Sequence, residues 1–246
     1  MRRLALSLVA LLFLAGPAPA EGFVLRTTTQ MLAQPLAFIF EGQAEVTSLL
    51  GAGTDPHTYQ PTRSDVRSLV EADAVTYHGL LFEAQLLDLM QQLERRLPAL
   101  SAEAYQPADD LLRDGGLPDP HTWHNPVLWI ETVVGVSRAL EEQTDLELSQ
   151  ARVTMLREAA LQTDAWIQDV FSGIAAEQRT VVSAHDAFQY YGERCGVRFE
   201  PLLGLSTASE TKLARLNELV DLIEAQDLSA VFSETTVENA GIAALR

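Results

Sequence analysis

Short runs rich in β-branched residues alternate with helical stretches along the chain, and one long periodic segment interrupts this alternation. Alternating strands and helices are typical of parallel sheets covered by helices. The interrupting segment, residues 147–177, has helical periodicity and contains no proline, and no glycine except Gly173. It is longer than an ordinary globular helix. The pattern therefore predicts an α/β protein with two lobes, residues 21–146 and 178–246, joined by one long backbone helix.

Local signals place the individual elements of each lobe. Thr62 and Asn125 have the features of N-caps, and Pro126 suits a first helical position. Residues 101–120 are polar, contain proline and glycine, and are expected to form a loop. The predicted strands are residues 23–29, 44–50, 74–77, 180–184, 197–202 and 229–233, and the predicted helices are residues 31–40, 62–71, 82–96, 126–142, 187–194 and 210–225. Because ligands of open α/β sheets bind at the carboxyl ends of strands, we expect a site in the cleft between the lobes.

The first twenty residues have the features of a secretory signal peptide. Arg2 and Arg3 precede an apolar run, residues 4–15, which is shorter than the roughly 20 residues that a membrane-spanning helix needs. Ala18-Pro19-Ala20 then offers the small residues of a cleavage site. We therefore expect export without stable membrane insertion and a mature chain that starts near Glu21. No cysteine lies near that site to carry a lipid anchor.

The charge and the cysteine content exclude some partners and cross-links. The formal net charge is −17, and it becomes more negative by two charges when Arg2 and Arg3 are removed. Such a surface repels nucleic acid and anionic lipid, so neither is an expected partner. Cys195 is the single cysteine of the sequence and cannot form an intramolecular disulfide. We expect it to be a small buried apolar residue.

The sequence Asp-Pro-His-Thr followed by an aromatic residue occurs twice, at residues 55–59 and 119–123, in a chain with five histidines. The surrounding sequences differ, which indicates two separate loops that serve the same function rather than an internal repeat. Each proline fixes its own φ and holds the preceding aspartate extended. A ligand on such a stiff loop loses less entropy on binding. Asp55 and Asp119 are either turn formers or groups that orient a histidine ring through its second nitrogen.

His57, His121 and His185 all lie in loops that follow strands or precede helices, where functional groups concentrate. Each of them taken singly is best explained as a hydrogen-bonded loop residue. Three of five histidines in matching contexts nevertheless favour a metal site, because imidazole is the commonest metal ligand in proteins. His124 forms a His-x-x-His pair with His121, without the glutamate of metalloproteases, and is an accessory ligand or an exposed residue. His78, at a strand end, is expected to be structural.

The chain resembles the cluster A-I metal-binding proteins of bacterial ABC transporters in three stretches, GAGTDPHTYQPTRSDVRSLVEADAVTYHGLLFE, DPHTWHNP and VVSAHDAFQYYGERCGV. These proteins are periplasmic or surface receptors for zinc and manganese, and the resemblance runs from about Phe23 to the end of the chain. It implies two α/β lobes, a long backbone helix and a metal ion buried between the lobes on His57, His121 and His185. It also implies delivery of the metal to a membrane permease driven by a cytoplasmic ATPase. We expect a monomeric receptor in the periplasm.

The chain departs from that family in two places. The family usually supplies a fourth ligand, commonly an aspartate, from a loop near the C-terminus, whereas this chain ends at Arg246 soon after SETTVENAG. Either the second lobe is incomplete, or water or another acid fills the fourth position. Glu234 is one candidate, although a partly exposed strand-end residue is the simpler interpretation. Residues 101–118 also lack the histidine-rich loop that zinc receptors of the family often carry.

The third histidine favours zinc. Manganese sites of this family tend to carry a carboxylate at the third position, where this chain has His185. Nitrogen-rich sites suit Zn²⁺ and carboxylate-rich sites suit Mn²⁺. We therefore expect a Zn(II) receptor, with Mn(II) or another divalent metal as the alternative.

Two other classes of protein fit part of the pattern. Three histidines and an open fourth position are also typical of a secreted zinc hydrolase, which needs a general base near the metal-bound water. Glu83 and Glu234 are the only candidates for that base, and no motif places either of them, so we expect no enzymatic activity. A sugar or amino-acid receptor would use aromatic stacking residues. The rings near the histidines, which we expect to shield a metal instead, are Tyr59, Trp123 and Phe188.

Overall fold

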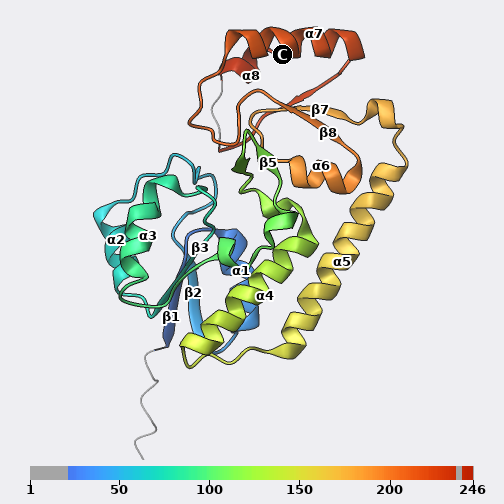
Figure 1. Ribbon diagram of the computed structural model, residues 1–246. Coiled ribbons are helices and arrows are strands. Elements are labelled where there is room, and N and C mark those ends of the chain that lie inside the picture. The colour runs from blue at the N-terminus through green and yellow to red at the C-terminus, as the bar shows by residue number, and fades with distance from the viewer. Residues whose placement is uncertain (1–21, 237–239, 246) are drawn as a thin grey trace, which may run out of the picture.

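The computed structural model of the protein describes residues 22–236 and 240–245, and the predicted signal peptide, residues 1–20, lies outside them. Two lobes occupy opposite ends of the molecule, and a long helix, α5 (Gln150–Ser172), runs along one side from one lobe to the other (Figure 1). The prediction of a two-lobed α/β protein with a connecting helix is confirmed. The helix lies within the predicted range 147–177 and is shorter at both ends.

The first lobe contains a parallel sheet with the strand order β2-β1-β3-β4. Its strands are β1 (Phe23–Thr27), β2 (Ala44–Ser48), β3 (Ala74–Tyr77) and β4 (Ala99–Ser101). All four residues of β3 are buried, as is typical of a strand covered on both faces. Leu25 of β1 pairs with Val46 of β2 and with Ala74 of β3. The edge strand β4 was not predicted.

Helices cover both faces of this sheet. They are α1 (Gln30–Ile39), α2 (Arg63–Val70), α3 (Leu87–Leu93) and α4 (Pro126–Gln143). One apolar core joins Leu25 to α1 and α4, and a second joins Val75 to α2 and α3. Both predicted N-caps are present, since Thr62 forms a capping box with Asp65 and the Asn125 side chain accepts a hydrogen bond from the Leu128 N–H.

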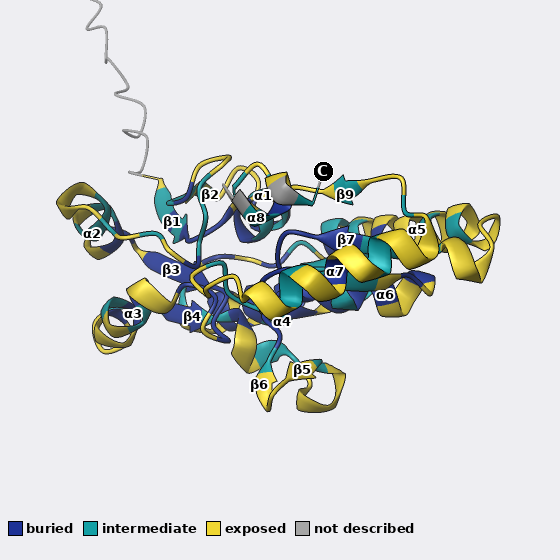
Figure 2. Cartoon of the chain, turned by 90° about the horizontal axis from the view of Figure 1, so that it is seen from above, coloured by how far each residue is buried: buried dark blue, intermediate teal, exposed yellow. Residues whose placement is uncertain are grey.

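The second lobe contains a parallel sheet of the order β8-β7-β9. Its elements are β7 (Thr180–Ser183), α6 (Gln189–Cys195), β8 (Arg198–Pro201), α7 (Leu213–Gln226), β9 (Val231–Phe232) and α8 (Ala240–Ala244). Its core includes Val182, Leu202 and Leu219. Cys195 is buried, as predicted. Seen from above in Figure 2, buried residues concentrate in β3, β4 and β7, while the outward sides of α5 and α7 are exposed.

The predicted helix over residues 82–96 is wrong in its first part. The chain forms a short 3₁₀ turn, η1 (Ala84–Leu86), before α3. Residues 79–81 all have positive φ, and the buried Glu83 carboxylate accepts hydrogen bonds from the backbone N–H groups of His78 and Gly79. This tight turn lies directly before the predicted start, and α3 begins five residues later than predicted, at Leu87.

The prediction of a simple loop over residues 101–120 is wrong. They contain the 3₁₀ turns η2 (Ala102–Tyr105) and η3 (Ala108–Asp110), followed by an antiparallel hairpin of β5 (Arg113–Asp114) and β6 (Leu117–Pro118). Gly115 and Gly116 have φ values of +56° and +86°, which suit a two-residue hairpin turn. The hairpin leads directly into the second Asp-Pro-His-Thr stretch and the 3₁₀ turn η4 (Thr122–His124). A further 3₁₀ turn, η5 (Ala176–Gln178), precedes β7.

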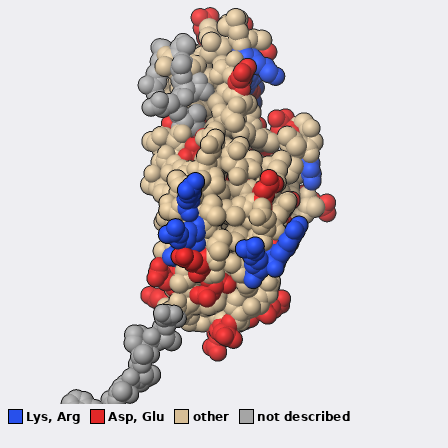
Figure 3. All heavy atoms as spheres, turned by 90° about the vertical axis from the view of Figure 1, so that its left-hand side faces the viewer, with Lys and Arg blue, Asp and Glu red and all other residues tan. Residues whose placement is uncertain are grey.

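The surface carries charged side chains of both signs. On the face shown in Figure 3, acidic and basic side chains are interspersed. None of the helices in the described part of the chain is both long enough and apolar enough to cross a bilayer.

Two glycines allow a test of the turn at residues 79–81. Gly79 and Gly42 have nearly equal φ values, +80° and +82°. A Cβ at Gly79 would lie 2.8 Å from Glu103 Cβ, whereas nothing lies within 4 Å of one at Gly42. We expect Gly42→Ala to lower the free energy of unfolding by about 1 kcal/mol through backbone strain. Gly79→Ala should cost about 1–3 kcal/mol more through overlap. Urea unfolding measures both, and equal losses would contradict the crowding at Gly79.

Candidate metal centre

His57 lies in the loop that follows β2. Its backbone N–H donates to Asp55 Oδ1 over 3.0 Å, and the Thr58 hydroxyl donates to Asp55 Oδ2 over 3.0 Å. Asp55 thus acts as a turn former, which is one of the two roles expected for it. The His57 ring meets the Phe82 ring edge-on, with centroids 4.9 Å apart. The loop backbone and Phe82 together hold the imidazole in place.

His121 lies between the β5–β6 hairpin and α4 and is 1% exposed. Asp119 Oδ1 lies 2.9 Å from the His121 backbone nitrogen and 2.7 Å from Nδ1. Because a carboxylate only accepts hydrogen bonds, Nδ1 carries the proton and Nε2 keeps its lone pair. Asp119 therefore takes the other expected role and orients the ring.

His185 follows the carboxyl end of β7 in the second lobe. Glu234, just after β9, places Oε1 2.7 Å from His185 Nδ1 and 3.2 Å from the His185 backbone nitrogen. This arrangement repeats that of Asp119 and His121. Glu234 is partly exposed and follows the end of β9, which agrees with the simpler interpretation of it as a strand-end residue. Its carboxylate in addition holds the outer nitrogen of His185.

The three imidazoles converge on one point between the lobes. The Nε2 atom of His121 lies 3.2 Å from that of His57 and 3.3 Å from that of His185. Potential ligand atoms of all three residues lie within 4.8 Å of one another, and no other such group of His, Cys, Asp or Glu occurs in residues 22–236 and 240–245. A tetrahedral zinc ion with bonds of about 2.0–2.1 Å separates its ligand nitrogens by about 3.3–3.4 Å. The spacing around His121 matches that geometry.

Burial disfavours the charged forms of His57 and His121. It lowers the pKa of His57 to about 3, with smaller contributions from the nearby His121 and His185. Burial also holds the pKa of His121 well below its usual value, and the neighbouring His185 adds to the effect. Neutral imidazoles offer lone pairs to a cation.

The buried carboxylate of Asp119 is only partly stabilised by hydrogen bonds. Burial raises the pKa of Asp119 to about 7, and among the described residues its Oδ2 atom has no hydrogen-bond partner. A buried carboxylate is costly unless positive charge lies nearby. A cation bound at the Nε2 side of His121 would supply that charge.

The cluster opens into a cavity of about 470 Å³ lined by both lobes. Phe82, Trp123 and Phe188 are among its walls, whereas Tyr59 is held by a hydrogen bond from its hydroxyl to Asp65. Phe82 was not predicted, because it was assigned to a helix. Its ring lies against both His57 and His121.

The remaining two histidines stay outside the cluster. His124 lines the cavity but is half-buried rather than exposed, with its ring 4.8 Å from that of Phe188. His78 lies 2.7 Å through Nε2 from the Thr29 hydroxyl and stacks on Trp129 at 4.9 Å. These contacts fit the structural role expected for His78.

Comparisons with known proteins agree with this geometry. Residues 26–246 match the family model described as zinc-uptake complex component A, periplasmic (ZnuA). The chain belongs to this family of metal-binding, substrate-binding proteins of ABC transporters. It is 34% identical over 238 residues to the manganese-binding lipoprotein MntA of Bacillus subtilis, a match that spans 94% of this chain and 77% of that protein. It is 32% identical over 236 residues to the zinc-binding protein TroA of Treponema pallidum, a match that spans 93% and 76% of the two chains.

The fold is also that of a solved relative. The structure of the periplasmic zinc-binding protein TroA from Treponema pallidum superposes with a TM-score of 0.85 at 29% identity, covering 92% of this chain and 82% of that one. The family resemblance noted in the sequence is therefore confirmed.

Asp119 provides a test of ring orientation. We expect Asp119→Ala to weaken Zn²⁺ binding by about 10- to 100-fold, because His121 loses the partner that fixes its tautomer. Asp110→Ala, on the exposed turn η3 of the same segment, serves as the control and should bind like the unchanged protein. Isothermal titration against a competing chelator measures both affinities. Unchanged affinity in Asp119→Ala would show that its hydrogen bond does not support the centre.

Proposed function

We propose that this protein is a periplasmic receptor that binds Zn(II) through His57, His121 and His185 and delivers it to an ABC import permease with a cytoplasmic ATPase. The convergence of the three Nε2 atoms carries the proposal. The outer nitrogens of two of these rings are held by carboxylates, as is common for metal-binding histidines.

The donor set supports zinc. Three nitrogens converge, while the carboxylates of Asp119 and Glu234 hydrogen-bond to the far side of the rings. Nitrogen-rich sites suit Zn²⁺, which also binds most sites more tightly than Mn²⁺ does. Three protein ligands leave one tetrahedral position for water or another acid, which would favour release of the ion to a transporter.

Manganese is the second candidate for the bound ion. The observation that favours it is the 34% identity to a relative described as manganese-binding. A Mn²⁺ ion, however, prefers oxygen ligands and more of them than three imidazoles supply. The two candidates therefore differ in the relative affinity that the isolated protein should show.

We propose binding rather than catalysis. A zinc hydrolase needs a carboxylate that can reach a metal-bound water. Glu83 accepts hydrogen bonds from the Thr28 hydroxyl and from two backbone N–H groups, and Glu234 is bonded to His185. Both candidate bases are thus already engaged. Turnover of a chromogenic ester or phosphate by the zinc-loaded protein would contradict this part of the proposal.

The family description supports a place outside the cytoplasm. We propose that the chain is exported and lies free in the periplasm. Because the relative from Bacillus subtilis is described as a lipoprotein, a membrane-anchored form is the alternative. Fractionation of cells that express the full chain separates the two.

A competition titration tests the choice of metal. Residues 21–246 are titrated with Zn²⁺ and with Mn²⁺ against a chromophoric chelator. We expect one-to-one binding and a clear preference for Zn²⁺, because the donors are imidazole nitrogens. Tighter binding of Mn²⁺ would favour the second candidate, and no binding of either ion would contradict the receptor proposal.

Single histidine substitutions test the ligand set. We expect His57→Ala, His121→Ala and His185→Ala each to weaken Zn²⁺ binding by at least about 100-fold, more than the loss of an outer hydrogen-bond partner. His124→Gln is the matched control, because this histidine lines the same cavity without joining the cluster. An affinity loss in His124→Gln as large as in His121→Ala would make His124 a ligand.

A further inference from the structure

The histidine cluster depends on how the lobes are held together. Both Asp-Pro-His-Thr loops belong to the first lobe, whereas His185 belongs to the second. An ion bound to all three histidines can leave only when at least one ring withdraws. Contacts that fix the lobes beside these loops should therefore affect the rate of metal release.

The second lobe reaches the first of these loops through Thr207. Its hydroxyl donates to Asp55 Oδ2 over 2.5 Å, across 152 residues of sequence. The other oxygen of the same carboxylate accepts the backbone N–H of His57. Asp55 therefore connects the His57 backbone to a side chain of the opposite lobe, and both Asp55 and Thr207 line the cavity at the cluster.

The second lobe reaches the other loop through Tyr190 of α6, which is 3% exposed. Its hydroxyl donates to the Asp119 carbonyl over 3.0 Å and accepts from the Leu112 N–H over 3.0 Å. Leu112 and Asp119 stand at the base of the β5–β6 hairpin, where the Asp119 N–H donates to the Leu112 carbonyl. The phenol thus completes the hydrogen bonding at the base of the hairpin, two residues before His121.

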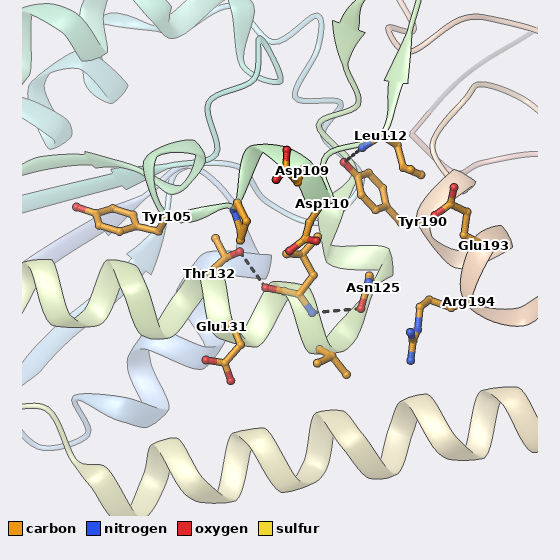
Figure 4. Close-up of a pocket in the computed structure, with 13 residues that line it drawn as sticks. Tyr105, Asp109, Asp110, Leu112, Asn125, Glu131, Thr132, Tyr190, Glu193 and Arg194 are labelled. Atoms are coloured by element: carbon orange, nitrogen blue, oxygen red, sulfur yellow. Dashed lines mark hydrogen bonds between the residues drawn. The ribbon is translucent and has the colours of Figure 1, made fainter.

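Figure 4 shows Tyr190 at the edge of a second cavity, with its hydroxyl directed at Leu112. This cavity, of about 580 Å³, lies among η3, the start of α4 and α6. Side chains leave this space unfilled, so packing between α6, η3 and the start of α4 is incomplete here. The hydroxyl bonds of Tyr190 are therefore suited to hold this part of the lobe interface.

We propose that Thr207 and Tyr190 are positioning residues. Each forms a hydrogen bond that holds one Asp-Pro-His-Thr loop against the second lobe and thereby slows metal release. We call these two contacts the clasps. This inference rests on the proposed metal-receptor function. Each hydroxyl bonds to the aspartate of one copy of the motif. Thr207 bonds to the side chain of Asp55, and Tyr190 bonds to the backbone carbonyl of Asp119. The repeated motif would then serve two purposes, presentation of an imidazole and attachment to the opposite lobe.

The clasps should affect dissociation more than association. A hydrogen bond that exists in the closed protein but is broken in the transition state for opening lowers the rate of metal dissociation. Removing it leaves the rate of metal association unchanged. The Thr207 bond is made to a carboxylate, and such charge-assisted bonds are stronger than neutral ones. Its loss should therefore have the larger effect.

The test uses near-isosteric variants of the mature chain. Thr207→Val and Tyr190→Phe each remove one hydroxyl. Thr207→Ser keeps it and should restore the behaviour of the unchanged protein. Thr58→Val is the matched comparison for Thr207→Val, because Thr58 donates to the same Asp55 oxygen from within the first lobe and makes no contact between the lobes through that bond. Tyr191→Phe, at the next position of α6, is the control for Tyr190.

Stopped-flow release of Zn²⁺ into excess chelator gives the dissociation rate. We expect release about 3- to 10-fold faster in Tyr190→Phe, and at least about 10-fold faster in Thr207→Val, with association rates within about twofold of the unchanged protein. Thr207→Ser and Tyr191→Phe should release at the original rate. Thr58→Val, which removes a hydrogen bond within the His57 loop itself, should accelerate release less than Thr207→Val does. Unchanged release in both test variants, or equal acceleration in Thr58→Val and Thr207→Val, would overturn the proposal.

Amide hydrogen exchange without metal provides a second readout and identifies variants that fail to fold. We expect faster exchange at residues 55–59 in Thr207→Val and at residues 111–121 in Tyr190→Phe, with the cores of both lobes unaffected. Unchanged exchange at these loops would overturn the clasps themselves. If the unchanged protein binds neither Zn²⁺ nor Mn²⁺, the receptor function fails, while the exchange result still decides whether the loops are clasped.

Discussion

The three imidazoles between the lobes meet at one buried point. Two pairs of Nε2 atoms are separated by 3.2 and 3.3 Å. Burial lowers the pKa of His57 and of His121, so both rings are uncharged at neutral pH. Imidazole nitrogens at this spacing repel one another unless a proton or a cation lies between them. The arrangement of the surrounding residues follows from that requirement, because each ring is held by a contact on its far side or along its edge.

The two-lobed fold supplies these contacts from distant parts of the chain. His57 and His121 follow elements of the first lobe, while His185 follows β7 of the second lobe and is held by Glu234 after β9. Parallel strands bring their carboxyl ends to one edge of each sheet, and the two edges face one cavity. The connecting helix α5 packs on the first lobe through Val153 and is tied to the second lobe by an ion pair between Asp164 and Arg194. The lobes therefore share a stiff support and also meet directly, through Thr207 and through Tyr190 of α6.

Much of the architecture followed from local patterns. The buried strand Ala74–Tyr77 and the helix start at Asn125-Pro126 were predicted because apolar runs and capping residues act over a few positions. The hairpin at residues 113–118 was missed, since its strands have two residues each and no apolar alternation. The start of α3 was misplaced because residues 84–86 form a 3₁₀ turn, and their helical spacing does not distinguish that turn from an α-helix. For the site, loop positions and the family resemblance selected the three histidines. The partners of Glu234 and Thr207 lie 49 and 152 residues away, and no local pattern specifies contacts at such separations.

X-ray absorption spectroscopy at the zinc edge of the metal-loaded mature protein tests the central claim most directly. The account predicts a first shell that contains three imidazole nitrogens at about 2.0–2.1 Å and at most one or two light oxygen donors. In His185→Ala, the multiple scattering from imidazole should correspond to two rings instead of three. A shell dominated by carboxylate or water oxygens, or one that keeps three imidazoles without His185, would contradict a zinc centre built by His57, His121 and His185 from both lobes.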